Sequence, residues 1–235
     1  MPSDYVDNYR KVLERIAIAC QKSGRRPDEI TIIGVTKGHS TEVLSKARAL
    51  GLTDLGENRV QEANNKYKLK NDFFADNPLR LHMIGHLQSN KVKQAVQLFD
   101  TIDSIDSIET ARLVNSRSRE LGKTIRCLIQ VNTSGEVQKS GVSPESTVDF
   151  VGQLLGLENI NFCGLMTIGR LDGTESHIRA CFSRLRELST EVSKQLKIQT
   201  FDVLSMGMSD DFDIAIEEGA TEVRLGTAIW GPREQ

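Results

Sequence analysis

Two patterns of apolar residues alternate along most of the chain. Short apolar runs rich in β-branched residues, such as residues 30–36, are typical of buried strands. Between them lie longer segments with apolar residues three or four positions apart, which are typical of amphipathic helices. Several of these segments stop at a glycine, as at Gly51 and Gly122, and glycine commonly ends a helix. The pattern therefore predicts an α/β protein.

The predicted elements form about eight strand–helix units after one leading helix at residues 4–23. The predicted strands are residues 30–36, 53–55, 80–84, 99–102, 125–131, 160–166, 201–204 and 222–225. The predicted helices are residues 41–50, 59–69, a helix that begins near 90, 108–121, 144–155, 175–196 and 210–218, and a short tail follows the last strand.

Strands that alternate with helices imply a parallel sheet with right-handed crossovers. Eight such units is the number that closes a TIM barrel, so we predict a TIM-like (β/α)8 barrel with an extra N-terminal helix. A doubly wound open sheet would show the same periodicity, and the pattern does not separate the two. No linker, low-complexity segment or change of composition divides the chain, so we expect residues 1–235 to form a single domain.

Composition narrows the range of partners. The 235 residues are 38% hydrophobic and 26% charged, with a net charge of −2, which is an ordinary globular profile. No long block of Lys and Arg calls for nucleic acid or an anionic membrane surface. No apolar stretch approaches the roughly 20 residues of a membrane helix, and no secretion signal opens the chain. The four cysteines form no C-x-x-C pair and are expected to be buried thiols in a reducing compartment, so we expect a cytoplasmic protein.

Lys37 stands directly after the apolar run 30–36 and before Gly38, at the carboxyl end of a predicted core strand. Burial disfavours the charged ammonium, and a neutral amine can attack a carbonyl carbon to form a Schiff base. The alternative is a lysine that has left the strand for solvent. Because function in a barrel concentrates at the carboxyl ends of the strands, this position favours the nucleophile.

The loops predicted after the seventh and eighth strands have residues suited to an anion. Ser205, Gly207 and Ser209 precede one predicted helix, and Gly226 and Thr227 follow the last strand. Small residues let backbone N–H groups approach an anion, and barrels often bind phosphate at these two loops. Helix capping and a tight turn could also explain either loop alone. Since both loops occur where a barrel would need them, the sequence predicts a phosphate site.

We expect no metal site. His82 and His86 are four residues apart on or just after a strand, where they would be separated by roughly 13 Å, too far to share one ion. Most Asp and Glu residues fall on predicted helix faces and are expected to be solvated.

Long motifs support these assignments in a fixed order along the chain. They are VTK at residues 35–37, GENRVQE at 56–62, HMIGHLQSNK at 82–91, GLMTI at 164–168, LSMGMSDD at 204–211 and VRLGT at 223–227. These motifs resemble those of the pyridoxal phosphate homeostasis proteins, single-domain relatives of the alanine racemase barrel, and the resemblance runs essentially end to end. One departure is Thr36 with residues 38–40, where the family often has Ser before the lysine and Pro shortly after it.

The resemblance implies a cofactor and its ligands. It implies that Lys37 carries pyridoxal 5′-phosphate (PLP) as an internal aldimine, and that Arg224 faces the pyridine nitrogen. It implies a phosphate site made by Ser205, Gly226 and Thr227, with Met208 and Ser209 nearby. It implies that the pocket is also lined by Asn58, His86 and Met166.

Two functional classes remain open. One is a protein of PLP homeostasis that stores, buffers or delivers the cofactor, possible recipients being PLP-dependent apo-enzymes. The other is a PLP-dependent enzyme such as an amino-acid racemase. Racemases of this fold add a β-rich domain that supplies a tyrosine, whereas this chain ends about ten residues after its last strand, and Tyr5, Tyr9 and Tyr67 are expected to lie away from the matched strand ends. We therefore favour the first class. A Schiff-base aldolase without cofactor would share the lysine but would not explain the Arg224 motif.

Overall fold

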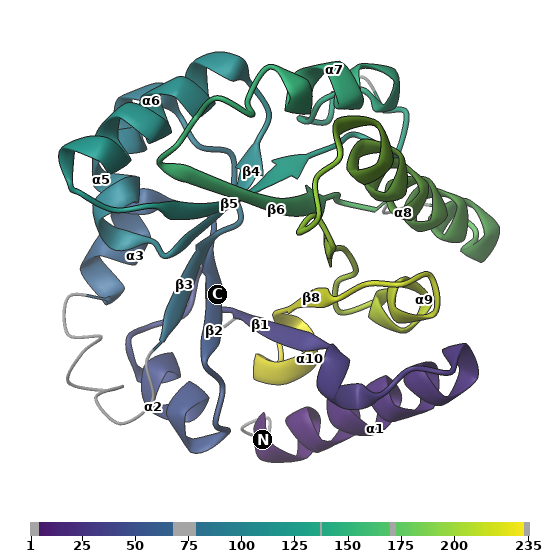
Figure 1. The fold of residues 1–235 in the computed structure, drawn as a ribbon. Helices are drawn as coiled ribbons and strands as arrows, with labels where there is room; N and C mark the ends of the chain where they lie inside the picture. The colour runs from purple at the N-terminus through teal and green to yellow at the C-terminus, as the bar shows by residue number, and fades with distance from the viewer. Residues whose placement is uncertain (1–4, 68–78, 137, 170–172, 233–235) are drawn as a thin grey trace.

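The computed structural model describes residues 5–67, 79–136, 138–169 and 173–232, and in them eight parallel strands close into a barrel (Figure 1). Each strand is hydrogen-bonded to the next, and β8 pairs with β1. The strands are β1 (Thr31–Val35), β2 (Asp54–Glu57), β3 (Arg80–Met83), β4 (Thr101–Ile105), β5 (Ile125–Gln130), β6 (Ile160–Met166), β7 (Val203–Ser205) and β8 (Glu222–Leu225). Closure confirms the TIM-like barrel and excludes the open sheet.

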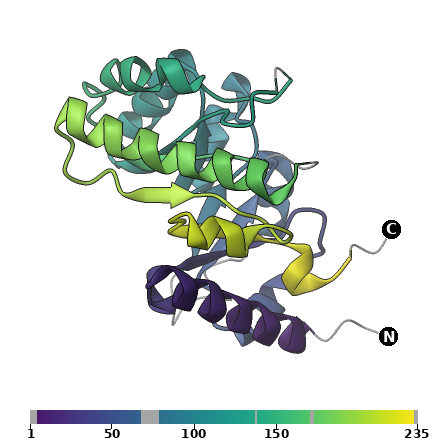
Figure 2. The same cartoon turned by 90° about the vertical axis from the view of Figure 1, so that its right-hand side faces the viewer.

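Helices surround the barrel (Figure 1). They are α1 (Tyr5–Ser23), α2 (Glu42–Ala49), α3 (Val60–Lys66), α5 (Val92–Leu98), α6 (Ile108–Glu120), α7 (Thr147–Gly152), α8 (Glu175–Leu196), α9 (Phe212–Glu217) and α10 (Thr227–Trp230), with short 3-10 turns at Pro27–Glu29, Ser89–Lys91 and Pro144–Ser146. The extra N-terminal helix α1 lies beside α9 and α10 (Figure 2), and Asn8 Nδ2 donates to the Ile229 carbonyl of α10 at 3.2 Å. None of the helices in the described ranges is long and apolar enough to cross a lipid bilayer.

Most predicted elements occur with ends shifted by a few residues, and the differences have physical causes. The fourth strand was expected at residues 99–102, but β4 runs to Ile105 because its polar residues Asp103 and Ser104 are buried in the barrel. The predicted tail contains α10, a helix too short to show a periodic pattern. Residue 4 and residues 68–69 of the predicted helices lie outside the described residues.

The interior of the barrel holds a network of charged side chains. His82 lies between two carboxylates, with Nδ1 3.0 Å from Asp103 Oδ2 and Nε2 3.1 Å from Asp54 Oδ1. Arg126 on β5 donates to Glu222 on β8 at 2.9 Å, and because these strands are not neighbours, the two side chains meet across the interior. The expectation of solvated acidic residues concerned helix faces; the strand carboxylates Asp54, Asp103 and Glu222 are buried and pair with His82 and Arg126.

This network gives the protein a specific pH dependence. Burial acts to lower the pKa of His82, but Asp103 and Asp54 outweigh it and raise the pKa to about 10. The folded protein therefore keeps a proton that the unfolded chain releases near its ordinary pKa of about 6.5. The stabilisation is complete below that pH and is lost as the pH rises through about 10. We expect the free energy of unfolding to fall across this window by up to about 1.4 kcal/mol per pH unit.

Urea unfolding at a series of pH values measures this slope. The exposed His177→Gln variant should keep the slope, whereas His82→Gln should flatten it, and the difference isolates His82 from other groups that titrate in the same range. Equal slopes in the two variants would show that His82 is not charged in the folded protein.

Candidate functional site

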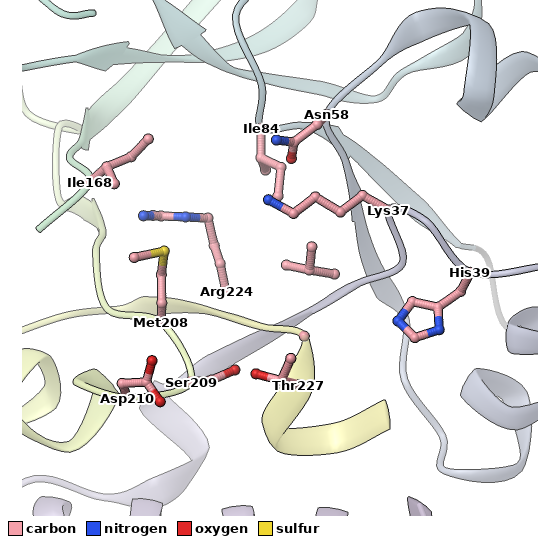
Figure 3. Close-up of a pocket in the computed structure, with 12 residues that line it drawn as sticks. Lys37, His39, Asn58, Ile84, Ile168, Met208, Ser209, Asp210, Arg224 and Thr227 are labelled. Atoms are coloured by element: carbon pink, nitrogen blue, oxygen red, sulfur yellow. The ribbon is translucent and has the colours of Figure 1, made fainter. Parts of the chain in front are cut away.

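A cavity of about 250 Å³ opens at the carboxyl ends of the strands (Figure 3). Its wall is built from the segments that follow β1, β2, β3, β6 and β7 and from β8 with the turn after it. The lining residues are Val35, Lys37, His39, Asn58, Ile84, Ile168, Met208, Ser209, Asp210, Arg224, Gly226 and Thr227. The site therefore occupies the place where the barrel fold concentrates function.

Lys37 extends from the end of β1 into this cavity, whose wall also includes Asn58 and Ile84 (Figure 3). Thr36, one residue earlier, is fully buried and belongs to the barrel. Gly38 has a φ of +75°, a left-handed conformation that glycine adopts without strain, and the chain turns there toward α2. The predicted lysine thus sits on a fixed strand end with its side chain directed into the cavity rather than away from it.

Arg224 supplies a buried cation to the same cavity. Its Nη1 donates to Ser205 Oγ at 2.9 Å and its Nη2 donates to the Thr167 carbonyl at 2.7 Å, so the guanidinium is held in one orientation. Burial lowers the pKa of Arg224, whereas Asp103, Asp211 and Glu222 act in the opposite direction. A guanidinium remains protonated near neutral pH even so, and the site keeps its positive charge.

The loops after β7 and β8 meet at one corner of the cavity. Ser209 Oγ accepts the backbone N–H of Ala228 at 3.1 Å, which joins the two loops beside Gly226 and Thr227. Gly207 allows this approach: its φ is +93°, and a Cβ there would lie 2.6 Å from Ala215 Cβ. Small residues and the hydroxyls of Ser209 and Thr227 are thus gathered at this corner, which suits an anion.

Three predicted site residues lie outside the wall of this cavity. Ser205 is fully buried and binds Arg224, and Met166 is fully buried at the end of β6. His86 is exposed, with Nδ1 3.5 Å from Asp106 Oδ2, and lines a second cavity of about 210 Å³. The second cavity shares three lining residues with the first, Asn58, Ile84 and Ile168.

The structure also adds residues that sequence reasoning did not select. Val35, Ile84 and Ile168 form apolar parts of the wall, and they follow the simple signal of being at or next to strand ends. His39 and Asp210 also line the cavity. The expectation that the tyrosines lie away from the strand ends is wrong for Tyr67, which directly follows α3 and whose hydroxyl is 2.6 Å from Thr36 Oγ1.

Comparisons with known proteins agree with this geometry. Residues 13–234 match the family described as the alanine racemase N-terminal domain. The chain is 40% identical over 233 residues to a pyridoxal phosphate homeostasis protein of Pseudomonas aeruginosa, which covers 99% of this chain and 97% of the relative. It is 39% identical over 224 residues to a protein of the same name from Aquifex aeolicus, covering 95% of this chain and 96% of the relative.

A solved structure gives a similar picture. PipY of Synechococcus elongatus, determined with PLP bound, is 34% identical to this chain and superposes with a TM-score of 0.80, covering 94% of this chain and 100% of PipY.

Proposed function

Because this chain belongs to the pyridoxal phosphate homeostasis proteins, within the family of the alanine racemase N-terminal domain, we propose that it binds PLP covalently through Lys37. The observation that carries the proposal is the presence in one cavity of an amine, a buried guanidinium and an anion-binding corner. PLP has an aldehyde that bonds to amines, a ring that can accept electrons, and a phosphate. The residues of the cavity offer one partner to each of these parts.

Each lining residue then has a role. Lys37 would hold the cofactor through its aldehyde carbon, and Arg224 would be the partner of the ring nitrogen. Ser209, Gly226 and Thr227 would hold the phosphate, with Met208 beside them. Ser205 acts through Arg224, which it orients at 2.9 Å, and Met166 supports the wall from behind. Asn58 lines both cavities, and His86 lines only the second one.

The role that this site supports is homeostasis of PLP in the cell: storage, buffering or delivery of the cofactor. Arg224 bears on this because PLP withdraws electrons most strongly when its ring nitrogen is protonated. A guanidinium cannot accept a proton, so Arg224 beside the ring nitrogen would disfavour its protonation and weaken catalysis at the α-carbon of amino acids. The names of the curated relatives also describe homeostasis rather than a reaction.

A role in PLP homeostasis predicts that the protein catalyses amino-acid reactions weakly and releases PLP to other proteins. We expect the purified protein loaded with PLP to exchange the α-proton of alanine or serine in D₂O no faster than the same concentration of PLP alone, measured by proton NMR. Incubated with a PLP-dependent apo-enzyme, the loaded protein should restore that enzyme's activity over time. Sustained turnover of an amino acid that Lys37→Ala abolishes would instead establish the alternative, a racemase-like enzyme.

The proposal also covers the recipients of PLP, the cellular compartment and the extent of the domain. PLP-dependent apo-enzymes are the proposed recipients, since they need the cofactor that this site holds. We place the protein in the cytoplasm, which accords with four buried cysteines, all in the described residues, that form no disulfide. We treat residues 1–235 as one PLP-binding domain, because β1 to β8 all belong to the same closed barrel.

A further inference from the structure

Helix α3 holds the backbone on both sides of Lys37. Lys66 Nζ donates to the carbonyl of Thr36 at 2.6 Å, immediately before Lys37. Glu62 Oε1 accepts the backbone N–H of Gly38 at 2.5 Å, immediately after it. The two side chains are four residues apart on α3, so they project from the same face of the helix. One helix therefore fixes both peptide groups that flank the proposed nucleophile.

Lys66 is itself a buried cation, and each of its three N–H donors has an acceptor. Besides Thr36, its ammonium donates to Glu57 Oε1 at 2.6 Å and to Glu62 Oε1 at 3.1 Å, and its side chain is only 4% exposed. An ammonium has three N–H donors, and these contacts account for all three. Partial burial acts to raise the pKa of Glu62, but the Gly38 N–H and Lys66 outweigh it and lower the pKa, so Glu62 is ionised at neutral pH.

The other side of Thr36 is held as well. The Thr36 hydroxyl donates to Glu57 Oε1 at 2.7 Å, and the Tyr67 hydroxyl lies 2.6 Å from Thr36 Oγ1. Since the single hydroxyl hydrogen of Thr36 goes to Glu57, the Tyr67 hydroxyl is the donor in the second bond. The peptide before Lys37 is thus anchored through its carbonyl and through its side chain.

Two simpler roles for Lys66 do not account for this arrangement. A second nucleophile would need a lone pair, and the ammonium of Lys66 is held as a cation by two carboxylates and a carbonyl. A purely stabilising ion pair is also a poor explanation, because well-packed apolar side chains commonly replace a buried ion pair at little cost in stability. What an apolar side chain cannot reproduce is the bond to the Thr36 carbonyl.

We propose that Lys66 and Glu62 are positioning residues that fix the peptide groups on either side of Lys37 and so direct its amine into the cavity. This inference rests on the proposed function of Lys37. A lysine suits the position because three acceptors converge on one compact ammonium, whereas the planar fork of an arginine is larger and directs its donors differently. The proposal therefore expects that Lys66→Arg does not restore the function of Lys66.

The test uses two kinds of variant, because loss of Lys66 alone would leave Glu57 buried without its cation. Lys66→Met combined with Glu57→Gln removes both charges together, and Glu62→Gln changes a side chain that is 31% exposed, so neither variant leaves an unpaired carboxylate in the interior at Glu57. Leu188→Ala is the matched control, since it removes a buried side chain on α8, a helix that lines neither cavity, and so lowers stability without changing the lining of the site.

We expect the double variant and Glu62→Gln to bind PLP about tenfold more weakly or worse, and to show an altered visible absorption spectrum of the bound cofactor. Leu188→Ala should lower the melting temperature and keep both the affinity and the spectrum. If the double variant and Glu62→Gln match the wild type in affinity and spectrum, the positioning role is wrong. If the wild type itself forms no adduct at Lys37, the proposed function fails instead, so the two failures are distinguishable.

Discussion

The Lys37→Ala protein should carry no borohydride-stable PLP, whereas the wild type should carry the cofactor on the peptide that contains Lys37. Borohydride reduces a carbon–nitrogen double bond to a stable single bond, so it records which amine held the aldehyde. Lys37 is the lysine whose side chain enters the cavity lined by Arg224 and Thr227 (Figure 3). Mass spectrometry of the digested protein measures the adduct directly, and we expect loss of essentially all of it in the variant.

A second lysine provides the matched control. Lys139 lines the neighbouring cavity, a short distance along the same mouth of the barrel. The Lys139→Ala protein should keep its main adduct at Lys37. An adduct found chiefly on Lys139 or any other lysine, with Lys37→Ala unchanged, would contradict the assignment.

The second large effect concerns the phosphate. Pyridoxal, which lacks the phosphate, should bind at least about a hundredfold more weakly than PLP, because charge-assisted hydrogen bonds are each worth roughly 1.5–3 kcal/mol. The corner formed by Ser209, Gly226 and Thr227 is the part of the cavity that should supply these bonds. Absorbance titration of the apo-protein with each compound gives the two affinities.

Substitutions at this corner should lower the affinity for PLP but not the affinity for pyridoxal. Thr227→Val keeps the shape of the side chain and removes its hydroxyl, so it should weaken PLP and leave pyridoxal unchanged, and Ser209→Ala should do the same. Equal affinities for PLP and pyridoxal in the wild type would rule out a site anchored through phosphate.

Much of the barrel could be predicted because local pattern and burial agree in it. The strands at residues 160–166 and 222–225 and the helix at 175–196 have the predicted bounds. The first strand and the helix are long segments with clear ends, and the short strand at 222–225 lies between Gly219 and Gly226. The β4 strand shows where the pattern fails: Asp103 is polar in sequence yet lies fully buried against His82. Its partner is on another strand, and no local pattern records such a pairing.

Part of the candidate site could also be predicted from the sequence. Lys37, Arg224 and the two loops lie at strand ends, so the barrel topology brings them together once the strands are identified. The direction in which a strand side chain points within the barrel is harder to predict. Ser205, for example, accepts a hydrogen bond from Arg224 and does not line the cavity. Lys66 gave no signal, and Glu62 appeared only as the last residue of the motif at 56–62, because on α3 both follow the ordinary pattern of a solvated helix face.

A crystal structure of the protein purified with PLP is the measurement that tests the central claim most directly. We predict continuous electron density from Lys37 Nζ to the cofactor, with the ring nitrogen facing Arg224 and the phosphate between Ser209 and Thr227. Density for PLP in the cavity beside His86 and Lys139, with the Lys37 side chain separate from it, would contradict the account.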